Sequence, residues 1–486
     1  MNLEALFDGL SYEVVCGTPD KDVKSIVYHS DKVTSGSAFF AIKGAEDDGR
    51  KYIKQALEKG ASVIVTDDRD GARLAPGDAG SAAVAVVSDT RQALAAASAN
   101  FFRRPAGGLL LIGVTGTKGK TTTTFMVKEI FERAGIKTGI IGTVVNGCEG
   151  YYTEADSTTP QSFEIQRMMR EMADRGCRAV VMEVSSQGLM QQRVYGLKFD
   201  AAVFTNISPD HIGGSEHKNF KDYLYWKTML FKQTKVAIIN KDDKYRQTFL
   251  KAAEGHADII KEYDTGSISL WRDGHILGSE YEFEGHRVRL PMPGDFNASN
   301  ASAAVTAARH FGIGWDVITG ALKSIKVPGR VEPVPCSDDF TVLVDYAHNG
   351  VALESLLRTL RRYNPQRLVT VFGCGGNRDP HRRTEMAKAA SAYADFSVIT
   401  SDNPRRENPM TIINDITSVM DACGGKYIVI PDRKEAITWA AAHGQPGDII
   451  IVAGKGHETY QIIGNEKIHF DDREIISCVN SQLKKL

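Results

Sequence analysis

Long apolar runs are missing from the sequence, and their absence narrows the classes of protein to consider. No run approaches the ~18 to 20 apolar residues that span a bilayer. Residues 1–15 carry acidic side chains where a secretory signal peptide carries Lys or Arg. We therefore expect no membrane insertion and a cytoplasmic location.

An excess of charge of either sign is also missing. Lys and Arg total 59 against 60 for Asp and Glu, so no overall positive field attracts the chain to nucleic acid. The seven cysteines are scattered and contain no C-x-x-C pair, which is typical of reduced intracellular thiols. We expect no nucleic-acid partner, no disulfide framework and no zinc cluster.

The length is greater than one hydrophobic core supports. The chain has 486 residues, and single cores stop growing near ~250 to 300 residues. A composition of 42% hydrophobic and 24% charged residues is that of folded domains. Pro and Gly interrupt the alternation of strand-like and helical segments at 101–108 and 325–330. We predict three domains, with bounds 1–102, 103–328 and 329–486.

Short apolar runs alternate with helical stretches along the chain, which predicts an α/β fold. The predicted strands are 25–28, 38–42, 61–65, 83–87, 109–114, 179–182, 201–204, 236–239, 342–344, 368–372, 397–400, 428–430 and 449–452. Because helical segments separate these runs, we predict a central domain with a parallel sheet and a C-terminal, Rossmann-like doubly wound domain.

A glycine-rich segment between a predicted strand and a predicted helix is the strongest motif. It reads GVTGTKGKTT over 113–122, and Val114 stands where the strict phosphate-loop pattern has Gly. Glycines let backbone N–H groups turn toward phosphate, Lys120 can contact the β and γ phosphates, and Thr121 can bind Mg²⁺. A chance Gly-Lys-Thr turn is the alternative. We predict a P-loop that binds ATP through Gly116, Thr117, Lys118, Gly119, Lys120, Thr121 and Thr122.

Two potential metal ligands follow the neighbouring predicted strands. Glu183 ends the strand 179–182, and His211 follows the strand 201–204. The carboxyl ends of parallel strands meet at one edge, where ligands of open α/β sheets bind. A helix cap or a surface group would explain either residue alone, but their coincidence with the phosphate loop favours a magnesium site.

Ten motifs in order resemble those of the Mur ligases, ATP-dependent amide-forming enzymes of peptidoglycan precursor assembly. They are GVTGTKGKTTT, STTP, MEVSS, TNISPDH, GDFNASNASAA, VPGRVE, VDYAHN, FGCGGNRD, SDNPRRENP and VAGKGHE, which begin at residues 113, 157, 182, 205, 294, 327, 344, 372, 401 and 452. The resemblance covers essentially the whole length. It implies an N-terminal domain for a uridine nucleotide, a central ATPase domain and a C-terminal domain for the incoming amino acid.

The resemblance also implies a reaction and its catalytic residues. A D-Glu carboxylate of the substrate attacks the γ-phosphate of ATP, and an amine then displaces phosphate from the acyl phosphate. Lys120, Lys227 and His211 are the implied catalytic residues. Thr121 and Glu183 would bind a first Mg²⁺, and His211 a second, together with a CO₂-derived carbamate on Lys227. Asn300, Arg330 and Asp345 would contact the ATP nucleotide.

Two further sets of residues are implied to bind the other substrates. For UDP-N-acetylmuramoyl-L-alanyl-D-glutamate they are Ser30, Thr158, Thr159, Ser185, Gln191 and Arg193. For the added amino acid they are Arg378, Asp402, Asn403, Arg405, Gly454 and Glu458. The chain departs from the family pattern at Gln187, over 213–217 and around Ser30.

The added amino acid in this family is mainly L-lysine or meso-diaminopimelate, which differ by one carboxylate on the far carbon. Selection of that carboxylate needs a fixed cation, and Arg binds a carboxylate with two parallel hydrogen bonds. Asp402-Asn403-Pro404-Arg405 matches the family's diaminopimelate signature, so we expect meso-diaminopimelate. A solvated loop arginine beside Arg406 is the alternative explanation of Arg405.

Other functions remain as alternatives. They are a lysine-adding homologue, folylpolyglutamate synthetase, which lacks the uridine-binding module, and a P-loop phosphotransferase of a different class. The turn after Phe372 lacks the G-x-G-x-x-G spacing, which argues against a nicotinamide dehydrogenase. We expect a monomer.

Overall fold

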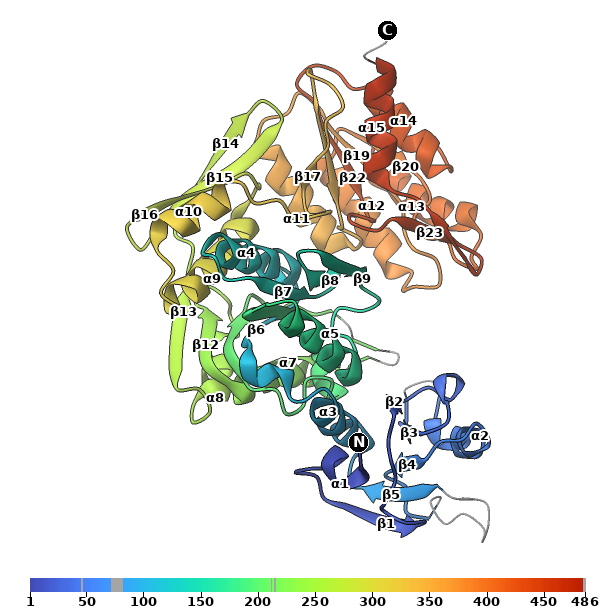
Figure 1. Ribbon diagram of the computed structural model, residues 1–486. Helices are drawn as coiled ribbons and strands as arrows, with labels where there is room; N and C mark the ends of the chain where they lie inside the picture. Colours follow the sequence, from blue (N-terminus) through green and yellow to red (C-terminus); the bar gives the residue numbers. More distant parts are fainter. Residues whose placement is uncertain (45–46, 71–81, 211, 214–215, 484–486) are drawn as a thin grey trace. The chain divides into compact units, whose positions relative to one another are not determined.

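The computed structural model describes residues 1–44, 47–70, 82–210, 212–213 and 216–483 (Figure 1). The chain divides into two compact units, Met1–Asp264 with Ala303–Ile313 and Thr265–Ser302 with Gly314–Leu486. Within the described ranges, no helix has the length and apolar character needed to cross a membrane. The three domain boundaries given above stay a prediction.

The first unit begins with a five-stranded sheet of order β1-β5-β4-β3-β2, in which β1 is antiparallel to β5. The strands are β1 (Tyr12–Cys16), β2 (Ser25–Val27), β3 (Ser37–Phe40), β4 (Val63–Thr66) and β5 (Ala83–Val87). The helices are α1 (Leu3–Leu6), α2 (Ile53–Glu58) and α3 (Thr90–Phe101). Four strands overlap predicted runs. We did not predict β1, because this edge strand is only partly buried and shows weak apolar alternation.

An eight-stranded sheet of order β13-β12-β11-β6-β10-β7-β8-β9 forms the rest of this unit. The strands are β6 (Leu110–Thr115), β7 (Thr138–Ile141), β8 (Val145–Cys148), β9 (Tyr151–Glu154), β10 (Ala179–Glu183), β11 (Phe199–Phe204), β12 (Thr234–Asn240) and β13 (Ile259–Tyr263). The pairs from β13 to β7 are parallel, which confirms the predicted parallel sheet, although β7 and β13 were not predicted as strands; β8 and β9 are antiparallel additions. The largely exposed β9 and β13 carry no continuous apolar run, so the sequence did not indicate them.

Helices with one apolar face cover this sheet. They are α4 (Lys120–Arg133), α5 (Ser162–Asp174), α6 (Ser186–Met190), α7 (Phe220–Thr228) and α8 (Arg246–Ala253). On α5, Ile165, Met168, Met169 and Met172 recur at helical spacing and are buried in one core with strand residues. Burial of that face holds the helix against the sheet.

The second unit starts with a small antiparallel sheet that the sequence did not predict. It contains β14 (Ile268–Asp273), β15 (Ile276–Phe283) and β16 (His286–Leu290). The helices α9 (Asp295–His310), whose residues from 303 on belong to the first unit, and α10 (Trp315–Lys323) follow. In β16, Val288 and Leu290 are buried while Arg287 and Arg289 are exposed, as in antiparallel sheets with one solvated face.

A six-stranded sheet of order β17-β18-β22-β19-β20-β21 completes the second unit. The strands are β17 (Glu332–Pro333), β18 (Thr341–Asp345), β19 (Leu368–Phe372), β20 (Phe396–Ile399), β21 (Tyr427–Val429) and β22 (Ile449–Ala453). The helices are α11 (Gly350–Arg361), α12 (His381–Tyr393), α13 (Pro409–Ala422), α14 (Arg433–Ala442) and α15 (Asp472–Leu483), and a hairpin of β23 (Tyr460–Ile463) and β24 (Glu466–His469) precedes α15. All five strands predicted in this region are present.

The two faces of this last sheet are both buried. Ile449 and Ile451 of β22 lie in one core with residues of α11, α12 and α13. Ile450 and Val452 lie in a second core with residues of α14 and α15. The alternation places helices on both faces, which confirms the doubly wound α/β fold and explains why the strand reads as a continuous apolar run.

Candidate active site

The phosphate loop is the turn from β6 to α4, and its shape requires glycine at Gly116. The backbone φ of Gly116 is 153°, and a Cβ there would lie 1.9 Å from Thr205 Oγ1. Gly119 has a φ of 85° and forms the N-cap of α4. The helix thus begins at Lys120 with its N-terminus at the turn, where unpaired N–H groups favour an anion.

The segment after the neighbouring strand β11 holds this loop in place. Asn206 accepts hydrogen bonds from Thr117 N at its carbonyl (2.8 Å) and from Lys118 N at Oδ1 (3.0 Å). Thr205 Oγ1 donates to the Lys118 carbonyl at 2.6 Å. The sequence reasoning missed these two supporting residues, although both belong to the motif TNISPDH that it quoted.

Two predicted lysines meet at one backbone carbonyl. Lys120 Nζ and Lys227 Nζ each donate to Gly116 O at 2.8 Å, although Lys227 lies on α7, far along the chain. Lys227 is fully buried, and this burial together with repulsion from Lys120 holds the pKa of Lys227 well below its ordinary value. Burial thus favours an uncharged amine on Lys227 beside the Lys120 ammonium.

Glu183 lies at the end of β10 and is 2% exposed. Thr121 Oγ1 donates to both of its carboxylate oxygens, at 3.0 and 3.1 Å. Thr143 adds a hydrogen bond from its backbone N at 2.8 Å and one from Oγ1 at 3.1 Å. The structure therefore brings the two predicted ligands of the first magnesium together. It adds Thr143, which no motif in the sequence had marked.

The residues predicted for the muramoyl-dipeptide gather next to Glu183. Thr158 Oγ1 lies 3.0 Å from Thr143 Oγ1, and Thr159 Oγ1 donates to the Glu183 carbonyl at 2.9 Å. Ser185 N donates to Thr159 Oγ1 at 2.9 Å. Arg193 donates to the carbonyl of Thr159 (2.5 Å) and to Gln191 Oε1 (2.7 Å).

Of the other residues predicted in this unit, Ser30 is not part of that cluster. Ser30 lies in η1 (Ser30–Lys32) beside the first sheet, where its carbonyl accepts from Lys59 Nζ at 3.0 Å. His211 lies outside the described residues, as do 214 and 215 of the altered segment. Among the residues that are described, His, Cys, Asp and Glu do not form a group of three or more around a metal position.

In the second unit, the three residues predicted for the nucleotide are each in contact with neighbouring residues or buried. Asp345 accepts from Val331 N and Ala347 N, both at 2.8 Å. The guanidinium of Arg330 lies over the Tyr346 ring, 4.7 Å from its centroid. Asn300 is buried on α9.

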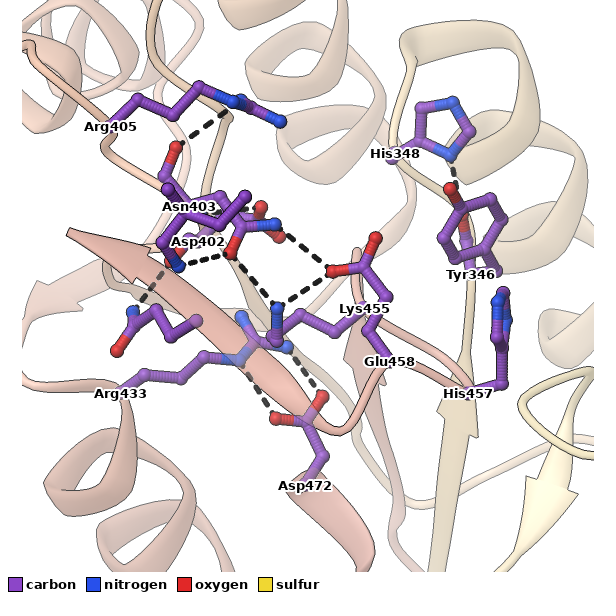
Figure 2. Close-up of polar contacts among 12 residues, drawn as sticks. Tyr346, His348, Asp402, Asn403, Arg405, Arg433, Lys455, His457, Glu458 and Asp472 are labelled. Atoms are coloured by element: carbon purple, nitrogen blue, oxygen red, sulfur yellow. Dashed lines mark hydrogen bonds and ion pairs between the residues drawn. The ribbon is translucent and has the colours of Figure 1, made fainter. Parts of the chain in front are cut away.

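The residues predicted for the added amino acid meet where β19, β20 and β22 end (Figure 2). Asn403 Nδ2 donates to Glu458 Oε2 at 3.0 Å. Gly454 has a φ of 115°, and a Cβ there would lie 2.6 Å from Asp402 Oδ2. That oxygen is buried and has no hydrogen-bond partner among the described residues. We call this cluster the amino-acid crevice, formed by the residues after these three strands.

Two arginines belong to the same crevice. Arg405 NH1 donates to the Gly376 carbonyl at 3.0 Å, and the backbone φ of Arg405 is 54°. Its backbone N donates to Ile462 O at 3.0 Å, and its carbonyl accepts from Gly464 N at 2.7 Å, so the β23–β24 hairpin holds it in this conformation. Burial and then the charge of Arg378 lower the pKa of Arg405. Two neighbouring guanidinium groups favour a bound carboxylate.

The sequence reasoning missed the polar residues that support this crevice. Lys455 donates to Glu458 and Asn403, and Arg433 forms a fully buried ion pair with Asp472 (Figure 2). Arg383 pairs with Glu407, whose carboxylate accepts from Asn377 N. Lys455 belongs to the quoted motif VAGKGHE, but the pairing of Arg433 with Asp472 depends on residues 39 positions apart.

A phosphate loop and a doubly wound domain with an amino-acid crevice define an ATP-dependent amide ligase. Three family models match the chain, the Mur ligase family catalytic domain at 22–102, the Mur ligase middle domain at 114–308 and the Mur ligase glutamate ligase domain at 329–456. The chain belongs to the Mur ligase family, whose members use ATP.

Curated relatives match over nearly the whole length. The UDP-N-acetylmuramoyl-L-alanyl-D-glutamate–2,6-diaminopimelate ligase of Aquifex aeolicus is 41% identical, covering 94% of this chain and 93% of its own. The ligase of the same name from Clostridium perfringens is 38% identical over 98% of this chain and 99% of its own.

Solved structures agree with these matches. A structure of a ligase with that same name has a TM-score of 0.69 at 29% identity and covers 99% of both chains. Folylpolyglutamate synthase of Mycobacterium tuberculosis has a TM-score of 0.60 at 19% identity, covering 75% of this chain and 92% of its own, which shows the shared fold alone.

Proposed function

We propose that this Mur ligase adds meso-diaminopimelate to UDP-N-acetylmuramoyl-L-alanyl-D-glutamate in peptidoglycan precursor synthesis. The near-complete coverage of the diaminopimelate ligases supports this assignment. The observation that carries it is the crevice, in which Arg405 and Arg378 lie together near the carboxylates of Asp402 and Glu458. Such a set of charges complements an amino acid that carries both a carboxylate and an ammonium on its far carbon.

In the first step, the D-Glu carboxylate attacks the γ-phosphorus of ATP, a P–O bond forms, and ADP leaves. Two anions must approach each other, so cations and N–H groups at the phosphate loop lower the barrier. We assign Lys120 to the transferring phosphoryl group. The N-terminus of α4 and the N–H groups of residues 116–122 other than those of Thr117 and Lys118, which donate to Asn206, would hold the other phosphates.

The donor set fits magnesium at the first position. Glu183 is a buried carboxylate whose hydrogen bonds come from Thr121 and Thr143, so it supplies hard oxygen ligands beside the phosphate loop. A bound Mg²⁺ would neutralise charge on the phosphoryl oxygens. Thr121 and Glu183 would hold it, and His211 would belong to a second ion.

Lys227 fits a carbamate because a neutral amine is the form that adds CO₂. Its amine is buried, and its pKa is lowered by burial and by Lys120. The addition forms a C–N bond and releases one proton, which converts a potential cation into an anion suited to a second magnesium.

In the second step, the free α-amine of the added amino acid attacks the acyl carbon and a C–N bond forms. The C–O bond to the phosphate breaks, phosphate leaves with the electron pair, and the nitrogen gives up one proton. We assign Arg405 and Arg378 to the far carboxylate of diaminopimelate, with Asp402, Asn403, Gly454 and Glu458 around the far ammonium. Thr158, Thr159, Ser185, Gln191 and Arg193 are assigned to the muramoyl-dipeptide, and Ser30 to its uridine side. Asn300, Arg330 and Asp345 stay assigned to the nucleotide.

The decisive experiment measures phosphate release with the UDP-muramoyl-dipeptide and a panel of amino acids. We expect turnover with meso-diaminopimelate and little with L-lysine. A kcat/KM for lysine equal to or above that for diaminopimelate would favour the lysine-adding homologue. Phosphate release that needs no amino acid would favour a phosphotransferase.

A further inference from the structure

Lys455 is a buried cation in the amino-acid crevice to which the proposed reaction gives no role. It is 0% exposed, and its Nζ lies 2.8 Å from Glu458 Oε2 and 3.2 Å from Asn403 Oδ1. A buried ammonium is costly unless it is paired. Figure 2 shows it pointing between the Asn403 and Glu458 side chains.

The contacts of Lys455 fix the orientation of the Asn403 amide. Asn403 Oδ1 accepts from both Lys455 Nζ and Ile462 N (2.9 Å), so this atom is the oxygen of the amide. The amide nitrogen is then directed to Glu458 Oε2 at 3.0 Å. One oxygen of Glu458 therefore receives two donors, which holds the carboxylate at a single angle and leaves Oε1 for another partner.

Asp402 keeps an open acceptor beside this group. Arg433 is balanced by Asp472 through two hydrogen bonds of 2.9 and 2.7 Å, and Arg405 and Arg378 are assigned to the far carboxylate of the added amino acid. Asp402 Oδ2 is buried and lacks a hydrogen-bond partner in the described part of the chain. A buried carboxylate oxygen of this kind is completed by a donor, and an ammonium group supplies both the donor and the opposite charge.

We propose that Lys455 is a positioning residue, which orients Glu458, directly and through the Asn403 amide, to receive the ammonium of the added amino acid that does not react. This inference rests on the proposed function. An amine bound between carboxylates stays protonated and has no lone pair for attack on the acyl phosphate. The crevice therefore holds the far ammonium and leaves the other amine free to react.

A purely structural role is assigned to a different pair. Arg433 NH2 donates to the carbonyl of Ala453, the last residue of β22, at 3.0 Å and pairs with Asp472 at the start of α15. This ion pair joins β22, α14 and α15 without Lys455. Loss of the Lys455 ammonium is thus expected to disturb the ligand contacts more than the fold.

The test combines one substitution with one missing ligand group. Lys455→Met and the wild type are compared on meso-diaminopimelate and on 2-aminopimelate, which lacks the far amine. Lys434→Met, at an exposed position of α14, is the matched control. Hydrogen bonds to charged groups contribute about 1.5 to 3 kcal/mol, so we expect about a 10- to 100-fold loss of kcat/KM for diaminopimelate, mainly in KM. The value for 2-aminopimelate should change less than about threefold.

Equal losses on the two amino acids, or no loss on either, would overturn the proposal. If Lys455→Met does not fold, the same comparison is made with Lys455→Arg, which keeps the charge but displaces the donor, and the selective loss on diaminopimelate is again expected. The preference of the wild type between diaminopimelate and lysine tests the proposed function. The change between wild type and variant tests Lys455, so the two failures are distinguishable.

Discussion

The phosphate loop and the amino-acid crevice both lie at the carboxyl ends of parallel strands, but their lysines have different partners. At the phosphate loop, Lys120 and Lys227 both donate to the Gly116 carbonyl, a dipole without net charge. In the crevice, Lys455 faces Glu458 and Arg433 faces Asp472. The first arrangement places the Lys120 ammonium where a polyphosphate would bind and keeps Lys227 as an uncharged amine. The second pairs buried cations with carboxylates, so that small differences between amino acids matter.

This contrast predicts that substitutions at the loop stop the reaction, whereas substitutions in the crevice change which amino acid is used. The largest effect is expected for Lys120→Ala, because the transferring phosphoryl group loses its positioned cation. We expect a loss of about 10³-fold or more in kcat with every amino acid. Phosphate release measures it, and Lys251→Ala, at an exposed position of α8, serves as the control. Near-normal turnover in the folded variant would contradict the assignment.

Lys227→Ala should give the next largest effect at the same loop. Removal of the proposed carbamate takes away an anion near magnesium, and we expect about a 100-fold loss of kcat or more. Added formate or acetate should restore part of the activity by replacing that anion. A fully active wild-type enzyme whose Lys227 is a plain amine, seen in electron density, would remove this residue from the mechanism.

Arg405→Ala tests the prediction that substitutions in the amino-acid crevice change which amino acid is used. Truncation of one partner of a buried charge pair costs about 2 to 5 kcal/mol, and we expect that loss in the selectivity for diaminopimelate over lysine. The ratio of the two kcat/KM values measures it. The neighbouring Arg406 is exposed, so Arg406→Ala is the matched control and should keep the selectivity. An unchanged ratio in Arg405→Ala would leave Arg405 as a surface arginine.

The smallest effects concern two buried thiols, one in each unit. Burial, with the neighbouring Asp402 charge, raises the pKa of Cys374 at the crevice to about 12. Burial and Cys148 raise the pKa of Cys177, beside the sheet of the phosphate loop, to about 12 as well. At pH 8 both thiols stay protonated, so their alkylation should be at least ~100-fold slower than that of exposed Cys423 and Cys478. Mass spectrometry of alkylated peptides follows the rates, and rapid labelling of Cys374 would show that the crevice floor opens.

Much of the fold could be predicted because its signals are local. Buried parallel strands such as β10 and β22 read as continuous apolar runs, and the glycines of the phosphate loop lie in one short segment. Edge strands escaped prediction since their residues are half exposed, as in β1 and β9. The antiparallel sheet of β14, β15 and β16 was also missed, since no motif marked that region.

The residues of the candidate sites also fall into two groups, those that a local motif marks and those that only the fold brings together. Lys120, Thr121 and Arg405 stand within motifs that the sequence displays, so their chemistry could be proposed without coordinates. Thr143 is recognisable only because the fold carries it to Glu183, 40 positions away.

The sequence by itself determined the α/β class, the phosphate loop and the resemblance to the Mur ligases. The periodicity of apolar residues and the positions of glycines are patterns within short segments, so they can be recognised without coordinates. Only the tertiary structure decided that Lys227 shares a carbonyl with Lys120 and that Lys455 fixes the Asn403 amide. Contacts of this kind join strand ends that are distant in sequence, and burial then sets the pKa and orientation of each group.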